Sequence, residues 1–182
     1  MNPYAEAMAG SEAFEWRKAM DAELLSHKRS AKWELVPRRT DTRSIGCRWC
    51  FAKKRDENGH VIPYKARLVA KGFKQKYAVD VFETYSPVAN MNSIRVILAV
   101  CVGSDYVMEQ LDADTAFLNS GLSDLVYMDV PHGVPSENGM VCKLQKDIYG
   151  LKQAASAWNK TIHILFLRNG FKSCGADQCV YV

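Results

Sequence analysis

Several features that would place a protein in a familiar class are missing from this sequence of 182 residues. The longest apolar run, VILAVCV at residues 96–102, is far shorter than the roughly 20 residues that a membrane-spanning helix needs. The opening MNPYAEAMAG has no basic stretch followed by an apolar one, which a targeting signal requires. We therefore expect a soluble, intracellular chain that has no membrane partner.

Familiar catalytic and metal motifs are missing as well. The sequence has no glycine-rich phosphate loop of the Walker type, and no serine has the elbow context of a hydrolase. Six cysteines without a secretion signal are typical of reduced thiols. Cys47 and Cys50 have the spacing of zinc ligands, but four residues separate Cys174 from Cys179 where a zinc site would have two. We therefore expect no structural zinc.

What the sequence does have is a strongly basic segment. Residues 28–76 hold 15 lysines and arginines against 4 aspartates and glutamates, a net charge of +11, whereas both flanking parts are acidic. Aromatic residues are interleaved with these cations, an arrangement that can neutralise phosphates and stack on bases. The segment therefore favours a nucleic-acid surface. The alternative is a solvated, lysine-rich strand face that protects a sheet edge.

The hydrophobic pattern predicts an α+β fold. We expect helices over residues 11–29, 92–104 and 153–169, and strands over 46–54, 60–70, 106–112, 125–130, 140–144 and 178–182. The first two strands form a hairpin, with Pro63 best placed on an edge. This order gives a sheet that collects carboxylates and a separate hairpin that collects positive charge, which suits a phosphoryl-transferring site.

The three helices also have predicted caps and apolar faces. In the first helix, Ser11 is a candidate N-cap, and the apolar face carries Phe14, Met20 and Leu24. The helix over 92–104 is predicted to be buried, with a capping Asn or Ser at its start and a glycine at its end. The last helix has four apolar residues at core spacing, which are Trp158, Ile162, Leu165 and Phe166. Its predicted C-cap is Gly170.

The stretch QLDADTAFLNS, residues 110–120, contains two carboxylates that could bind a metal. The strand over 106–112 would deliver Asp112 at its end, and Asp114 follows two residues later. Mg²⁺ prefers carboxylates together with phosphate oxygens and water, so a single strand-end aspartate supplies only part of the required shell.

Six blocks of the sequence carry a resemblance to a known family. They are KWELVPRR (32–39), RWCFAKKRDENGHVIPYKARLVAKGFKQK (48–76), QLDADTAFLNS (110–120), VYMDVPHG (126–133), CKLQKDIYGLKQAASAW (142–158) and GADQCVYV (175–182). These blocks resemble the reverse transcriptase domain of copia-type (Pseudoviridae) retrotransposon Pol polyproteins. The resemblance implies a right-hand polymerase fold of which the chain holds the fingers and part of the palm. The implied division is a helical lead-in over 1–30, a fingers-like basic hairpin region over 31–91 and a partial palm over 92–182.

The resemblance also implies a two-metal nucleotidyl transfer that uses Mg²⁺ or Mn²⁺. Asp112 is the expected catalytic metal ligand, and the backbone carbonyl of Ala113 is a further ligand. Asp114 would lie in the turn beneath the triphosphate of the nucleotide, without a metal role. Phe117 corresponds to an aromatic residue that blocks a ribose 2′-hydroxyl, although a plain core phenylalanine is an equal alternative.

The remaining implied contacts come from the basic hairpin and from the YGLKQ block. Tyr149 and Gly150 would face the nucleotide and the template, because glycine lets backbone approach them closely. Gln153 would not contact the nucleotide or the template itself and would at most support the residues that do. Lys65, Arg67 and Lys71 are the implied contacts to the triphosphate or the template. The sequence does not decide which of the three makes which contact. Further nucleic-acid contacts are expected from Lys53, Lys54, Arg55, Lys74 and Lys76.

The implied partners are an RNA or DNA primer–template, a deoxynucleoside triphosphate and the rest of a Pol polyprotein, in the cytoplasm. Family members carry a second acidic motif, Asp-Asp, beyond the position of Val182, so we expect the chain to be inactive alone. Three hypotheses remain open: a fragment of an RNA-directed DNA polymerase, a non-catalytic nucleic-acid-binding remnant of a transposable element, and a relic without a molecular role.

Overall fold

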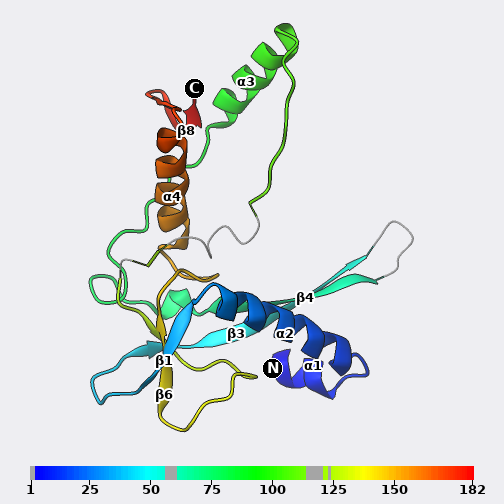
Figure 1. The fold of residues 1–182 in the computed structure, drawn as a ribbon, viewed down its shortest axis with the longest axis vertical. Helices are drawn as coiled ribbons and strands as arrows, with labels where there is room; N and C mark the ends of the chain where they lie inside the picture. The colour runs from blue at the N-terminus through cyan, green and yellow to red at the C-terminus, as the bar shows by residue number, and fades with distance from the viewer. Residues whose placement is uncertain (1–2, 56–60, 114–120, 123) are drawn as a thin grey trace.

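A computed structural model describes residues 3–55, 61–113, 121–122 and 124–182 (Figure 1). The N-terminal part of the chain forms two helices, α1 (Pro3–Ala9) and α2 (Ala13–Arg29). Helix α2 packs across strand β4 (Val61–Ala70). No helix among the described residues is both long enough and apolar enough to cross a membrane.

The predicted apolar face of α2 is confirmed for Met20, which is buried, and for Leu24, which packs against the core, but it is wrong for Phe14. Trp16, Met20 and His27 are buried, whereas Phe14 is 76% exposed. Phe14 precedes Trp16 by two positions, which turns its side chain by about 200° around a helix of 3.6 residues per turn. The cap was also predicted wrongly, because Glu12 and not Ser11 occupies the N-cap position, and its side chain makes no capping hydrogen bond.

The predicted basic hairpin is confirmed. It consists of β3 (Cys47–Arg55) and β4 (Val61–Ala70), which pair antiparallel. Tyr64 pairs with Lys53 and Ile62 pairs with Lys54, so Pro63 is an extra, unpaired residue at a β-bulge. A bulge is one of the few places where a strand tolerates proline, because proline has no N–H to donate to the ladder.

A four-stranded sheet lies next to the hairpin, in the order β1-β6-β5-β2. Its strands are β1 (Trp33–Pro37), β2 (Ser44–Ile45), β5 (Tyr127–Met128) and β6 (Met140–Leu144). β1 and β5 run antiparallel to β6, and β2 runs parallel to β5. The two C-terminal predictions for this sheet, over 125–130 and 140–144, are confirmed, the first of them with shorter bounds.

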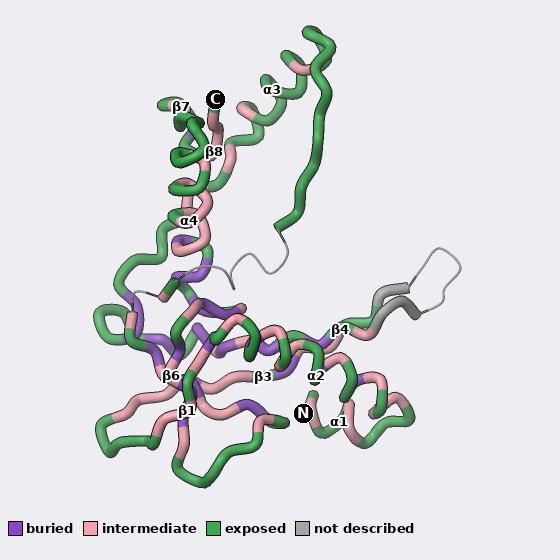
Figure 2. Tube along the Cα trace, viewed as in Figure 1, coloured by how far each residue is buried: buried purple, intermediate pink, exposed green. Residues whose placement is uncertain are grey.

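One apolar core connects the sheet, the hairpin and α2. Its buried members are Met20, Ile45, Trp49, Ala66, Leu68, Ala70, Val126, Met128, Cys142, Leu144, Ile148, Leu151 and Ala154. Figure 2 shows that the buried segments gather in this part of the chain. Strands from both the predicted fingers region and the predicted palm region thus contribute to a single core.

The segment after residue 90 departs most from the prediction. Helix α3 (Met91–Gly103) forms and ends at the predicted glycine, but its cap is Asn90, whose side chain accepts a hydrogen bond from the Asn92 N–H at 2.9 Å. The predicted burial is wrong, because no residue of α3 is buried and the helix lies apart from the core (Figure 1).

The predicted strand over 106–112 is also wrong. No residue of this stretch belongs to a strand. A strand requires a neighbour for its backbone groups, and in the part of the chain that the structure describes the edges of the sheet, β1 and β2, do not pair with this stretch. Asp112 therefore lies in an irregular, exposed segment.

The C-terminal part consists of α4 (Ala154–Arg168) and a hairpin of β7 (Ser173–Cys174) and β8 (Asp177–Tyr181). The helix and the last strand are confirmed. Gln153 and Asn169 flank the helix, and the following Gly170 has a left-handed φ of +89°. Of the residues predicted at core spacing, Leu165 is 52% exposed and the other three are half-buried.

Candidate nucleotide and nucleic-acid interface

The alternation of side chains along β4 sorts its residues onto two faces. Ala66, Leu68 and Ala70 are buried in the core, whereas Lys65 and Arg67 point to solvent on the opposite face. The strand therefore brings two of the three predicted phosphate contacts together. Lys71 follows at the end of the strand, is half-buried and donates its backbone N–H to the Gly46 carbonyl at 2.8 Å.

The YGLKQ block lies against this end of the hairpin. The Ala70 N–H donates to the Tyr149 carbonyl at 2.8 Å, and the Arg67 guanidinium lies 4.9 Å from the centre of the Tyr149 ring. At that distance the ring quadrupole attracts the cation. The structure therefore joins Arg67 and Tyr149, which lie far apart in the sequence, into one surface.

Gly150 makes the closest backbone approach in this region. Its φ of +90° lies in the left-handed region, and a Cβ at this position would overlap the Ala70 carbonyl oxygen and lie 2.6 Å from Val69 Cγ1. A Cβ on Gly72 would in turn overlap the Gly150 carbonyl oxygen. Both glycines are thus needed for the chain to pack against itself, a requirement that was not evident from the sequence.

A buried glutamine joins the same two segments. Gln75 Nε2 donates to Gln153 Oε1 at 3.0 Å, and the Lys152 N–H donates to Gln75 Oε1 at 2.9 Å. Gln75 and Gln153 are both 4% exposed. Sequence reasoning missed Gln75, because a polar residue between two lysines has no local pattern that signals burial.

Lys53 lies on the other face of the hairpin from Lys65 and Arg67. Its ammonium forms an ion pair with Glu12, which precedes α2, and lies 5.8 Å from the Trp16 ring and 5.6 Å from the Tyr64 ring. The structure therefore does not bring Lys53 to the surface formed by Arg67 and Tyr149.

Of the other predicted cations, the structure describes the side chains of Lys74 and Lys76. Lys74, in the short 3₁₀ helix η1 (Gly72–Lys74), and Lys76 are exposed. The Lys76 N–H donates to Asp80 Oδ2 at 2.8 Å. The side chains of Lys54 and Arg55 lie outside the described residues, as do Asp114 and Phe117.

The acidic part of the predicted site is represented by Asp112 and Ala113, both exposed. Their carboxylate and carbonyl oxygens are the kind of ligand that Mg²⁺ and Mn²⁺ accept, so the donor chemistry fits a divalent cation. These two residues fill only part of an octahedral shell. Among the residues that the structure describes, no group of three His, Cys, Asp or Glu side chains is close enough to hold a metal.

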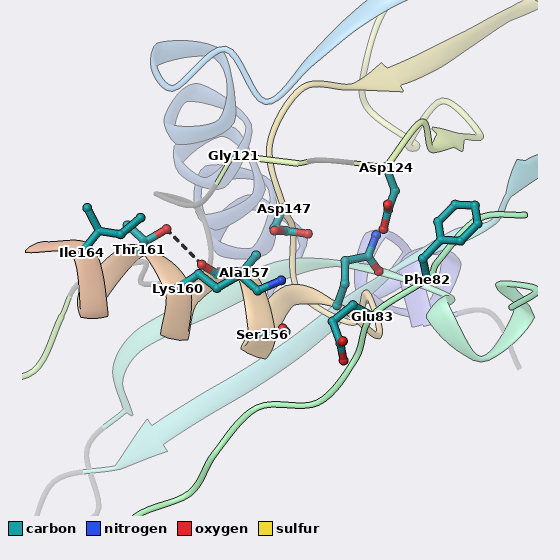
Figure 3. Close-up of a pocket in the computed structure, with 11 residues that line it drawn as sticks. Phe82, Glu83, Gly121, Asp124, Asp147, Ser156, Ala157, Lys160, Thr161 and Ile164 are labelled. Carbon is teal, nitrogen blue, oxygen red and sulfur yellow. Dashed lines mark hydrogen bonds between the residues drawn. The ribbon is translucent and has the colours of Figure 1, made fainter. Parts of the chain in front are cut away.

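A second acidic feature, which had no signal in the sequence, lies at the start of α4. A cavity of about 320 Å³ is bordered by residues that include Asp147, Asp124, Gln153 and Lys160 (Figure 3). Asp147 is fully buried, and burial, reinforced by the Asp124 charge, raises its pKa to about 7. Neither carboxylate oxygen of Asp147 has a hydrogen-bond partner within the described chain.

Comparison with known proteins establishes the family. The chain belongs to the reverse transcriptases: the family model described as reverse transcriptase (RNA-dependent DNA polymerase) matches residues 30–182. The resemblance of the six sequence blocks is therefore confirmed. No solved structure matches the chain.

The relatives are Pol polyproteins of copia-type transposons. The chain is 42% identical over 170 residues to the retrovirus-related Pol polyprotein from transposon RE2 of Arabidopsis thaliana, and 41% identical over 170 residues to that from transposon RE1. It is 39% identical over 178 residues to that from transposon TNT 1-94 of Nicotiana tabacum. These matches cover 92%, 92% and 97% of this chain, but the chain spans only 12%, 12% and 13% of the relatives' length.

Proposed function

We propose that this chain provides the fingers and part of the palm of a copia-type RNA-directed DNA polymerase with a right-hand fold. The observation that carries the proposal is the Arg67–Tyr149 contact, which unites the basic hairpin and the YGLKQ block in one surface. Family membership supports the chemistry, and the +11 charge of residues 28–76 supports a phosphate-rich ligand. The division at residues 30 and 91 and a cytoplasmic location belong to the same proposal.

Each residue has a defined part in the proposed reaction. Lys65, Arg67 and Lys71 bind the phosphates of the nucleotide or template, where fixed cations stabilise the negative charge that develops during transfer. Tyr149 supports Arg67 through its ring. When bound, a divalent cation would activate the primer hydroxyl and neutralise the triphosphate, and Asp112 with the Ala113 carbonyl would hold it.

The proposed nucleotide selection depends on Phe117, which would exclude a ribose 2′-hydroxyl and so favour deoxynucleotides. Asp114 would lie in the turn beneath the triphosphate. The partners in this proposal are a primer–template and the remaining parts of a Pol polyprotein, as in the relatives named above.

A second candidate function is nucleic-acid binding without catalysis. The observation that favours it is the contrast between the two halves of the site. The cations of β4 are held on a paired strand above a buried core, whereas Asp112 is exposed and outside any strand. Primer extension by the chain that Asp112→Asn abolishes would exclude this second function.

The experiment that tests the shared part of both functions is binding to a primer–template duplex as a function of salt. The test variant is Lys65→Gln/Arg67→Gln/Lys71→Gln. The control removes the same charge from exposed positions of α2, which covers the other face of the hairpin: Arg17→Gln/Lys18→Gln/Lys28→Gln.

We expect the slope of log K against log salt to fall by about 0.9 for each phosphate that the test variant no longer neutralises, and to change little in the control. No binding at low salt, or equal slopes for the two variants, would contradict the proposal. Circular dichroism of each variant checks that its fold is intact.

A further inference from the structure

Two segments of the candidate site are joined by a buried amide junction. The first, residues 70–80, begins at the last residue of β4 and contains Lys71, and the second, residues 149–153, contains Tyr149 and Gly150. Each segment supplies part of the proposed phosphate-binding surface, so the geometry of that surface depends on how the two segments are held together.

Gln75 makes most of the polar contacts between them. Its Oε1 accepts from the Lys152 N–H at 2.9 Å, and its backbone carbonyl accepts from Lys152 Nζ at 3.0 Å. Its Nε2 donates to Gln153 Oε1 at 3.0 Å and to the Asp80 carbonyl at 3.3 Å. The Gln75 side chain therefore connects the YGLKQ block to its own loop, which it contacts at Asp80.

We propose that Gln75 is a positioning residue that, through Gln153 and Lys152, holds the Tyr149–Gly150 turn against the phosphate-binding end of the hairpin. This inference rests on the proposed function, because it concerns the same surface. The side-chain hydrogen bonds of Gln75 reach residues 152 and 153, and Gln75 therefore acts on Tyr149 through the backbone between them.

The chemistry of the junction explains why a glutamine is required. Both ends of the Gln75 amide are used, one as an acceptor and one as a donor, in a site that is 4% exposed. A methionine has nearly the same length but offers neither group, so the Lys152 N–H and Gln153 Oε1 would both lose their partner. Buried groups without partners favour a different backbone arrangement.

Gln153 is free to serve this junction because it is not needed as a cap. It occupies the N-cap position of α4, yet its side chain makes no capping hydrogen bond. Its Oε1 is turned to Gln75 instead. A side-chain contact thus fixes the start of the helix to the segment after β4. The same contact fixes the position of the turn that comes before the helix.

Close packing of the two glycines makes this arrangement sensitive to small shifts. Gly72 and Gly150 leave no space for a Cβ between the segments, and Gln75 Oε1 lies 3.0 Å from the place where a Gly72 Cβ would stand. Without the amide hydrogen bonds the segments would separate, and the Tyr149 ring would move away from the Arg67 guanidinium.

The experiment compares Gln75→Met with Gln145→Met in the full chain. Gln145 is exposed and its side chain forms no hydrogen bond with the described part of the chain, so it is a matched control for the change of residue type. The first readout is amide hydrogen exchange, which needs no ligand. We expect faster exchange of the Lys152 and Ala70 amides in Gln75→Met, with unchanged exchange in β1 and β6, and no change in the control.

The second readout is duplex affinity in a cycle of variants. We expect Gln75→Met to weaken binding by about tenfold, within the range of couplings between neighbouring sites. Combined with Tyr149→Ala it should cause little further loss of affinity, because each change removes the same contribution. When Gln75→Met is combined with Lys65→Gln, the two losses of affinity should add, because Lys65 lies on the paired part of β4.

A second variant guards against a general folding defect. Gln153→Met removes the same Gln75–Gln153 hydrogen bond but leaves the acceptor of the Lys152 N–H in place. We expect it to weaken binding as Gln75→Met does, with slower Lys152 exchange than in that variant. Global unfolding of both variants would overturn the inference, since the pair would then hold the whole fold.

The two proposals fail differently. If the unmodified chain does not bind duplex, the proposed function fails, and the exchange data alone decide on the junction. If the chain binds duplex but Gln75→Met leaves both affinity and Lys152 exchange unchanged, the positioning role is refuted while the proposed function stands.

Discussion

The backbone of Gly72 packs directly against the Gly150 carbonyl, which occupies the place where a Cβ on Gly72 would stand. Gly72 follows β4, and Gly150 belongs to the turn before α4. Their contact brings the backbones of two distant segments together and sets the distance between the cations of the hairpin and the Tyr149 ring. The candidate site is therefore built on backbone packing as much as on side-chain chemistry.

The first prediction concerns the other side of Gly150, which packs against the end of β4. Gly150→Ala places a methyl group against the Ala70 carbonyl and forces an L-residue to keep a φ of +90°. We expect it to lower the free energy of unfolding by about 2–5 kcal/mol, from the sum of backbone strain and overpacking. Denaturant titration measures the change.

Gly170→Ala is the control for that measurement. Its φ of +89° is nearly the same, but no atom beyond its two chain neighbours lies within 4 Å of the added Cβ. We expect a decrease of about 1 kcal/mol from strain alone. Equal decreases for the two variants would show that the close packing contributes nothing.

The second prediction separates two lysines of one hairpin. Lys65 is exposed on the Arg67 face, whereas Lys53 forms an ion pair with Glu12 on the α2 face. We expect Lys65→Gln to weaken duplex binding and to lower its salt slope by about 0.9, and Lys53→Gln to leave both unchanged. Fluorescence anisotropy at a series of salt concentrations measures both quantities. Equal affinities and equal salt slopes for the two variants would contradict the prediction.

The third prediction is a pH dependence of stability that arises from Asp147. Burial holds its pKa at about 7 in the folded chain, against the ordinary 3.8. Between these values the folded chain binds more protons than the unfolded chain, so the free energy of unfolding falls as pH rises from about 4 to 7. Above pH 7 the cost of the buried charge remains.

Asp147→Asn tests this directly, because an amide has the shape of the neutral acid and does not ionise. At pH 5 we expect little difference from the unmodified chain. At pH 7.5 we expect a gain that approaches about 4 kcal/mol at most, the free-energy equivalent of a pKa raised from 3.8 to about 7. Urea titrations across this range give the difference. A constant difference at all pH values would show that Asp147 does not titrate as described.

The fourth prediction concerns α3. Val100 is 52% exposed on this helix, whereas Val141 of β6 is fully buried. We expect Val100→Gln to change the free energy of unfolding by less than about 0.5 kcal/mol, as surface substitutions do. Val141→Gln should cost about 3 kcal/mol or more, because it disrupts apolar packing and buries an amide. Thermal unfolding of the two variants checks the contrast.

The sequence predicted best where a local pattern decides the structure. The hydrophobic pattern predicted the hairpin, and the structure shows that its alternation places Lys65 and Arg67 on the face opposite the buried Ala66 and Leu68. The periodicity of α4 predicted that helix for the same reason. In each case the residues that determine the element lie within the element itself.

Tertiary features could not be predicted in this way. The apolar sequence of α3 indicated a buried helix, but burial needs neighbouring elements, and none of its residues is buried. The junction of Gln75 with Gln153 joins polar residues 78 positions apart. Asp147 has the local sequence of a surface carboxylate, but it is buried, beside a cavity that is bordered by distant segments of the chain as well as by α4.

The two faces of the basic hairpin also constrain changes in its length. One residue inserted between Tyr64 and Ala70 would reverse every side chain beyond it, so that Lys65 or Arg67 would enter the core. The bulge at Pro63 already contains one residue more than its partner strand. Insertions on the far side of that bulge leave the inner pairs in phase, so the hairpin is able to vary in length at its tip while its base keeps one register.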